Sequence, residues 1–179
     1  MLTGRIILNF VPVMLLVLAA AGAAALHLGV SMQNERQNDR LAAAARTAAG
    51  LLDGGALRSA ALQTGGTEES RQALDAQLNA AAKAAEKVSQ VEDVGLVLYV
   101  LRGEEYLCAG ATNARDAFYS AAFMTPLERE LPAGTVQAIT ACAQDGGSVT
   151  FYHNGLRCTG YFEPVLAADG TLAGLVEAR

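Results

Sequence analysis

The sequence predicts an α+β fold: a five-stranded antiparallel sheet with flanking helices, preceded by one transmembrane helix. Three observations lead to this prediction. Residues 6–28 contain no charged side chain. Residues 67–90 repeat apolar side chains at helical spacing. The second half of the chain consists of short runs rich in β-branched and aromatic residues, separated by turn residues.

The uncharged segment 6–28 is long enough, as a helix, to cross a bilayer core of about 30 Å. Arg5 and the terminal amine precede it, and mixed charges follow within residues 35–40. The positive-inside rule therefore favours a cytoplasmic N-terminus, residues 1–5, and an extracytoplasmic body, as in a single-pass protein of the cell (inner) membrane. The small residues at 23–25 could form a cleavage site, so a cleaved signal peptide is the alternative. The apolar run, however, is longer than the apolar region of a signal peptide, which usually has about 7–15 residues.

Charge and motif content exclude several classes of function. The net charge is −5 and the 13 Lys and Arg residues are scattered, which argues against nucleic-acid binding. The sequence contains no P-loop, no H-E-x-x-H and no G-x-S-x-G motif, and His153 is the one histidine outside the apolar segment. Its three cysteines lack the spacing of a zinc site. We therefore expect neither an enzyme nor a bound metal or cofactor. Because His153 lies beside the predicted turn Asn154-Gly155, we expect it to be a solvated turn residue.

Residues 29–90 are predicted to form a stalk and a second helix. Residues 31–52 are rich in helix formers, so the membrane helix should continue outward until Asp53-Gly54-Gly55 stops it. The apolar stripe of this stalk is mostly alanine and buries little area alone, so we expect it to pack on the body or on a second copy, as a homodimer. Thr67 can cap the second helix, and its buried face should contain Leu74, Leu78, Ala81, Ala85 and Val88.

Residues 91–179 are predicted to form the sheet. Residues 94–101 and 106–111 make a first hairpin, and 148–153 and 156–166 make a second, joined by Asn154-Gly155, a pair preferred in two-residue turns. Residues 172–178 form the fifth strand, and 134–144 a short helix. The stretch 112–133 has no sustained period, and loops of that length in compact domains are usually functional, so we take it as a ligand loop.

Three segments resemble the Cache family, the PAS-like extracytoplasmic sensor domains of bacterial chemoreceptors, diguanylate cyclases and sensor kinases. LLDGGAL at 51–57 is similar to the family's element at the end of its outer helix, and VGLVLYVLRGEEYL at 94–107 to its first hairpin. GYFEPVLAADGTLAGLVEA at 160–178 is similar to its last hairpin. The resemblance covers residues 30–178 and implies a PAS-like sheet that binds a small molecule in signal transduction, for example in chemotaxis. The family's second membrane helix and output module would lie on a partner or on a longer chain.

A sensing pocket in such a fold would lie between one sheet face and the loop 112–133. Such pockets need apolar walls and a few converging polar groups. Arg115 can grip a carboxylate with two parallel hydrogen bonds, although a surface ion pair with Asp116 is the simpler reading, and each tyrosine can equally be a core residue. The candidate ligand-binding residues are Tyr99, Arg115, Asp116, Tyr119, Tyr152 and Tyr161.

Three hypotheses for function follow. In the first, a small molecule, such as an organic or amino acid, binds the sensor domain and shifts the stalk and transmembrane helix. In the alternative, the chain is a membrane-tethered protein-interaction module with no small-molecule ligand. The third is redox sensing through a disulfide between Cys142 and Cys158, which requires Cα atoms within about 7 Å. Three reduced thiols that pack as small hydrophobes remain an equal alternative.

Overall fold

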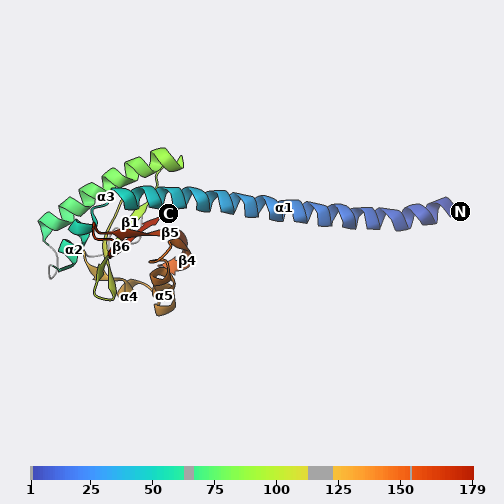
Figure 1. Cartoon of the computed structure of the whole chain (residues 1–179). Coiled ribbons are helices and arrows are strands. Elements are labelled where there is room, and N and C mark those ends of the chain that lie inside the picture. The colour runs from blue at the N-terminus through green and yellow to red at the C-terminus, as the bar shows by residue number, and fades with distance from the viewer. Residues whose placement is uncertain (1, 63–66, 113–122, 154) are drawn as a thin grey trace. The chain divides into compact units, whose positions relative to one another are not determined.

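A computed structural model describes residues 2–62, 67–112, 123–153 and 155–179 of the chain (Figure 1). The chain divides into two compact units, Met1–Gln37 and Asn38–Arg179. The helices are α1 (Leu2–Leu51), α2 (Gly54–Leu62), α3 (Glu68–Ser89), α4 (Leu127–Glu130) and α5 (Ala133–Ala141). The strands are β1 (Leu96–Arg102), β2 (Glu105–Ala111), β3 (Thr125–Pro126), β4 (Gly147–His153), β5 (Leu156–Leu166) and β6 (Leu172–Ala178).

The N-terminal unit consists of the first part of α1. Its side chains from Val13 to Gln37 are exposed, and an 18-residue stretch reaches a mean hydropathy of 2.2. By length and composition this helix can cross a membrane, and an N-terminal signal sequence meets the same criteria. The predicted apolar helix is therefore confirmed, and α1 continues without a break through the predicted stalk to Leu51.

The predicted stop at Asp53-Gly54-Gly55 is confirmed, but its mechanism differs from a simple glycine cap. Asp53 Oδ1 accepts hydrogen bonds from the backbone N–H groups of Gly55 (2.8 Å) and Ala56 (3.3 Å), so Asp53 caps the start of α2. Gly54 is required by close packing, because a Cβ there would meet the backbone carbonyl of Leu166. The turn that ends α1 thus also docks α2 on the end of β5.

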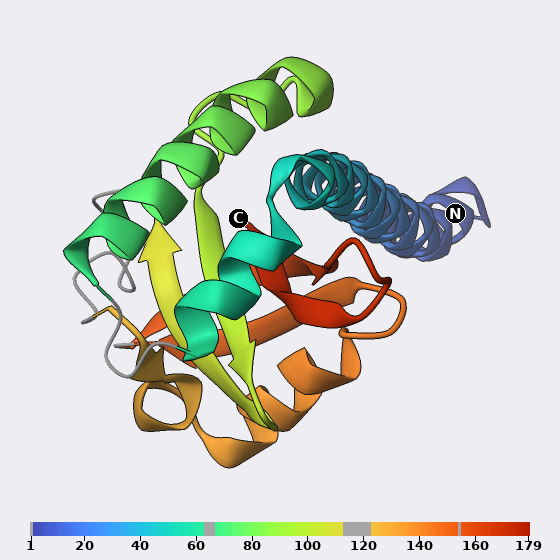
Figure 2. The ribbon, with the colours of Figure 1, turned by 60° about the vertical axis from the view of Figure 1, so that its left-hand side comes forward.

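The sheet is antiparallel, with strand order β3-β2-β1-β6-β5-β4, and it curls as Figure 2 shows. All five predicted strands are present, with ends within two residues of the predicted ones. The prediction of five strands was nevertheless wrong, because the sheet has six. The additional strand, β3, has two residues and pairs with β2 at Leu107 and Cys108. It lies inside the predicted loop 112–133, where two residues are too few to produce a sequence period.

One face of the sheet, here the helix face, packs against α2, α3 and the part of α1 that belongs to the second unit. Its core is built from alanine and leucine: Ala44, Ala45 and Ala48 of α1 and Leu57 of α2 are all fully buried. Alanines let helices approach a sheet closely, since their side chains add little thickness. The strand residues beneath them include Leu96, Leu98, Val100, Val176 and Ala178.

Helix α3 follows the predicted pattern except at its last turn. Thr67 caps it, with its side-chain oxygen accepting a hydrogen bond from the Ser70 N–H at 3.1 Å. The predicted face, Leu74, Leu78, Ala81 and Ala85, is buried. Val88 was placed on that face wrongly and is 59% exposed. Ser89 is buried instead, and its hydroxyl donates to the Ala85 carbonyl. At about 100° per residue, Val88 lies at the edge of the stripe of buried α3 residues and Ser89 within it.

The opposite face, here the aromatic face, is covered by the short helices α4 and α5 (Figure 2). Its buried residues include large aromatics and two cysteines: Tyr99, Tyr106, Cys108, Cys142, Phe151 and Phe162. Leu127 and Leu131 near α4 and Ile139 of α5 complete this second core. The short helix predicted at 134–144 is therefore confirmed, as α5 with an earlier end.

Candidate functional site

The described tyrosines among the candidate ligand residues lie in three different places. Tyr99 of β1 is fully buried in the aromatic face. Tyr152 of β4 is 66% exposed, and Tyr161 of β5 packs against the core of the helix face. Arg115, Asp116 and Tyr119 lie outside the described residues. The structure therefore does not bring Tyr99, Tyr152 and Tyr161 together into one pocket.

A cavity of about 180 Å³ lies between α3 and β2. Two residues that belong to the predicted ligand loop 112–133, Thr112 and Phe123, line it. Helix α3 contributes Arg71, Asp75, Leu78 and Asn79, and β2 contributes the run Cys108, Ala109, Gly110 and Ala111. None of the described candidate ligand residues lines this cavity; its polar side chains come mainly from α3, which the sequence had indicated only as a packing helix.

Three polar side chains of this cavity come from one side of α3. Arg71 Nε lies 3.9 Å from Asp75 Oδ2, one helical turn away, and the Asn79 side-chain amide donates to the Asp75 carbonyl at 2.8 Å. Opposite them, Gly110 presents bare backbone: a Cβ there would lie 3.0 Å from Asp75 Oδ1. A cation, a carboxylate and an amide of α3 therefore line the cavity beside the bare backbone of Gly110.

The aromatic face contains a buried polar cluster that includes Tyr99. The Tyr99 hydroxyl donates to Glu177 Oε2 at 2.6 Å, and Arg179 Nη2 donates to the same oxygen at 3.2 Å. Glu177 is fully buried. Burial raises the pKa of Tyr99 well above its usual value, the nearby Glu177 carboxylate raises it further, and Arg179 acts in the opposite direction. Tyr99 is therefore held as a neutral hydrogen-bond donor.

Arg46 of α1 contacts two residues of β5 on the helix face. Its Nη2 donates to the Tyr161 hydroxyl at 3.1 Å, and its guanidinium lies 5.7 Å from the centre of the Tyr161 ring. Arg46 Nε also lies 3.7 Å from Glu163 Oε2. Partial burial raises the pKa of Glu163, and Arg46 lowers it. Tyr161, predicted as a ligand residue, is here a contact between the stalk helix and the sheet.

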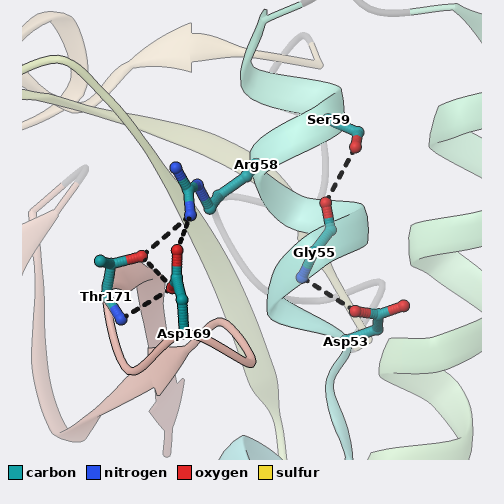
Figure 3. A network of polar contacts seen from close by, with 6 residues as sticks. All are labelled: Asp53, Gly55, Arg58, Ser59, Asp169 and Thr171. Atoms are coloured by element: carbon teal, nitrogen blue, oxygen red, sulfur yellow. Dashed lines mark hydrogen bonds and ion pairs between the residues drawn. The ribbon is translucent and has the colours of Figure 1, made fainter.

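A second polar network joins α2 to the turn between β5 and β6 (Figure 3). Arg58 Nη1 donates to Asp169 Oδ2 at 2.8 Å and to the Thr171 hydroxyl at 2.9 Å. Hydrogen bonds from the Thr171 hydroxyl and N–H, together with Arg58, lower the pKa of Asp169 to about 2. This network is exposed and holds secondary structure together, so we assign it a structural role.

The cysteines and His153 lie in or beside the aromatic face. None of the described cysteines, Cys108, Cys142 and Cys158, forms a disulfide, and the first two are buried. Burial raises the pKa of Cys142, which makes it a poor nucleophile. The prediction that His153 is a solvated turn residue was wrong: it is 3% exposed, and its Nε2 lies 3.6 Å from Glu130 Oε2. Its strand pairs with β5 up to His153 itself, which turns this side chain inward.

Sequence reasoning missed Glu177 and Arg179, and a signal for Glu177 was present. An acidic residue inside the otherwise apolar run 172–178 has to be buried if the strand is central, and a buried charge needs a partner. The partners lie far away in sequence, so they could not be named in advance.

Comparison of the chain with protein-family models, with curated proteins and with solved structures found no match.

Proposed function

We propose that the chain is a membrane-anchored extracytoplasmic sensor domain of the PAS-like, Cache-related type. A small molecule binds in the cavity between α3 and β2, and the signal passes through α1 to the membrane segment. The cavity carries this proposal, because two residues of the predicted ligand loop, Thr112 and Phe123, line it together with polar side chains of α3 and the bare backbone of Gly110. Its volume, about 180 Å³, suits a compact metabolite such as an organic or amino acid.

A route from the cavity to the stalk supports the proposal. Leu78 lines the cavity and is 1% exposed, and it belongs to the same buried core as Ala44, Ala45 and Ala48 of α1. Closely packed side chains transmit small displacements, since a core has little free volume. A ligand that binds more tightly to one position of α3 than to another therefore favours that position, and with it one arrangement of α1. The size of this effect is limited to the difference between the two binding free energies.

The test is a thermal-shift screen of the full chain, in detergent, against organic and amino acids. A binder should raise the Tm in a saturable way. Gly110→Val places a side chain in the cavity from the strand side and should abolish that shift. Ser148→Val, an exposed β-strand position away from the cavity, is the matched control and should keep it. A shift that survives in Gly110→Val would place the ligand elsewhere.

The membrane anchor is tested separately. We expect the mature protein to retain its N-terminal residues by mass spectrometry and to stay in the membrane fraction after an alkaline carbonate wash. A reporter active only outside the cytoplasm should be active when fused to the body. A mature chain that begins after the small residues at 23–25 would instead identify the segment as a cleaved signal peptide.

A second candidate function is a membrane-tethered interaction module without a small-molecule ligand. The observation that favours it is the aromatic face, which the chain's own side chains fill, among them Tyr99, Phe162 and Glu177. In that case the screen gives no saturable shift, while cross-linking through cysteines introduced in the stalk captures a homodimer or a partner protein. Stalk dimerisation together with ligand binding would favour the sensor.

A further inference from the structure

The aromatic face contains a carboxylate in a setting that water does not reach. Glu177 lies on β6, one of the two central strands, and is fully buried. A carboxylate in such a place is unfavourable unless its surroundings supply hydrogen-bond donors and positive charge. The groups around Glu177 therefore have to recognise a carboxylate, whichever molecule carries it.

Those groups are the ones that bind carboxylate ligands in proteins. A phenol and a guanidinium, from Tyr99 and Arg179, converge on one oxygen of Glu177, at 2.6 Å and 3.2 Å. Arg179 is itself mostly buried, with 12% of its side chain exposed. Charge-assisted hydrogen bonds of this kind are stronger than those between neutral groups. Two of the donors that a carboxylate-binding site needs thus meet at Oε2 of Glu177.

Aromatic rings supply the apolar half. Phe162 stacks on Tyr99 with ring centres 6.0 Å apart, and Phe151 lies 6.4 Å from Phe162. The Arg179 guanidinium lies 5.8 Å from the centre of the Phe151 ring, which holds it in a cation–π contact. Apolar walls around a few converging polar groups are the composition of a small-molecule pocket.

Gly160 leaves the space that Glu177 fills. It lies on β5, next to β6, and a Cβ there would lie 2.6 Å from both Cγ and Cδ of Glu177 and would overlap Oε1. Its backbone has no positive φ that would require glycine for conformational reasons. The absence of a side chain at residue 160 therefore serves to admit the glutamate side chain.

We infer that the aromatic face is a small-carboxylate-binding site that the chain occupies itself, with Glu177 as the tethered ligand. A tethered group has a high effective concentration, so free carboxylates do not displace it from the native protein. Because Glu177 fills the site, the aromatic face keeps the conformation of an occupied site without a free ligand. Removal of the Glu177 side chain should convert it into an open site for monocarboxylates such as acetate.

The test uses the full chain in detergent, with Glu177→Ala, and sodium acetate as the probe. Acetate should raise the Tm of Glu177→Ala saturably, by about 3–6 °C at ten times its Kd, relative to sodium chloride at equal ionic strength. Acetamide, which has the same shape without the charge, should not. The native chain should show no saturable response to either compound.

Two further variants separate site binding from general effects of salt. Glu177→Gln removes the charge but keeps the volume, so acetate should give no shift. Adding Tyr99→Phe to Glu177→Ala should weaken acetate binding about tenfold or more, because a hydrogen bond to a charged group is lost. If Glu177→Ala does not fold alone, refolding with acetate, but not with acetamide, should restore the near-ultraviolet circular dichroism of the tyrosines.

The inference is overturned if acetate has no effect on Glu177→Ala in either experiment, or if acetamide or chloride acts equally well. It is independent of the cavity between α3 and β2. Gly110→Val, which fills that cavity, should leave the acetate response of Glu177→Ala unchanged, so the two proposals fail separately.

Discussion

The two faces of the sheet use different means to stay packed. The helix face is built from alanines and leucines of α1, α2 and α3 over aliphatic strand residues. The aromatic face has short helices over tyrosine, phenylalanine, cysteine and one buried carboxylate. Hydrophobic burial has no direction and scales with area, whereas the Tyr99–Glu177–Arg179 cluster depends on specific partners. The first face should therefore respond to changes of volume, and the second to loss of a single polar group.

The largest effect is expected from Glu177→Ala on the aromatic face. Removing one partner of a buried ion pair leaves the other charge uncompensated and costs about 3–5 kcal/mol. Urea unfolding in acetate-free buffer, followed by the near-ultraviolet circular dichroism of the tyrosines, measures it. Glu105→Ala, which removes an exposed pair with Arg102, should cost no more than about 1 kcal/mol. Similar losses in the two variants would contradict the contrast between buried and exposed pairs.

The helix face should instead be sensitive to added volume. Ala81 of α3 is fully buried and its neighbour Ala80 is exposed, so Ala81→Leu and Ala80→Leu form a matched pair. Overpacking at Ala81 should cost about 1–3 kcal/mol, while the change at Ala80 should stay within about 0.5 kcal/mol. The same unfolding experiment applies. Equal tolerance at both positions would mean that α3 does not pack tightly on the sheet.

The same contrast explains how much the sequence could predict. Periodicity located five strands and the buried face of α3, because apolar spacing directly reports which side of an element is covered. It failed at Val88, which lies at the edge of the buried stripe of α3, and at β3, which is too short for a period. The candidate site was harder. Tyr99 was predicted as a ligand-binding residue, whereas its hydrogen-bond partner Glu177 lies 78 residues later and was not predicted. Only the fold brings the two together.

Glu163 offers a smaller test of the helix face, through pH. Burial raises its pKa above the ordinary 4.5, and Arg46 opposes that shift. An acid with a raised pKa stabilises the fold most when protonated, below the ordinary pKa, and this contribution is lost as pH rises through the raised value. Glu163→Gln mimics the protonated form. Its Tm relative to the native chain should therefore be higher at pH 7 than at pH 4; the opposite trend would mean that the contact with Arg46 outweighs burial.

Asp169 should give the smallest effect, with the opposite sign, because it is exposed and its hydrogen bonds compete with water. Bonds from Thr171 and Arg58 lower its pKa from 3.8 to about 2. Its contribution is therefore fully present above about pH 4 and is lost as pH falls towards 2. Asp169→Asn should lower the Tm at pH 6 but match the native chain near pH 2. Asp145→Asn, an exposed aspartate outside this network, is the control and should show no such convergence. A constant Tm difference across this range would mean that the negative charge of Asp169 does not contribute to stability. The contact between α2 and the β5–β6 turn would then depend on the shape of the Asp169 side chain and not on its charge.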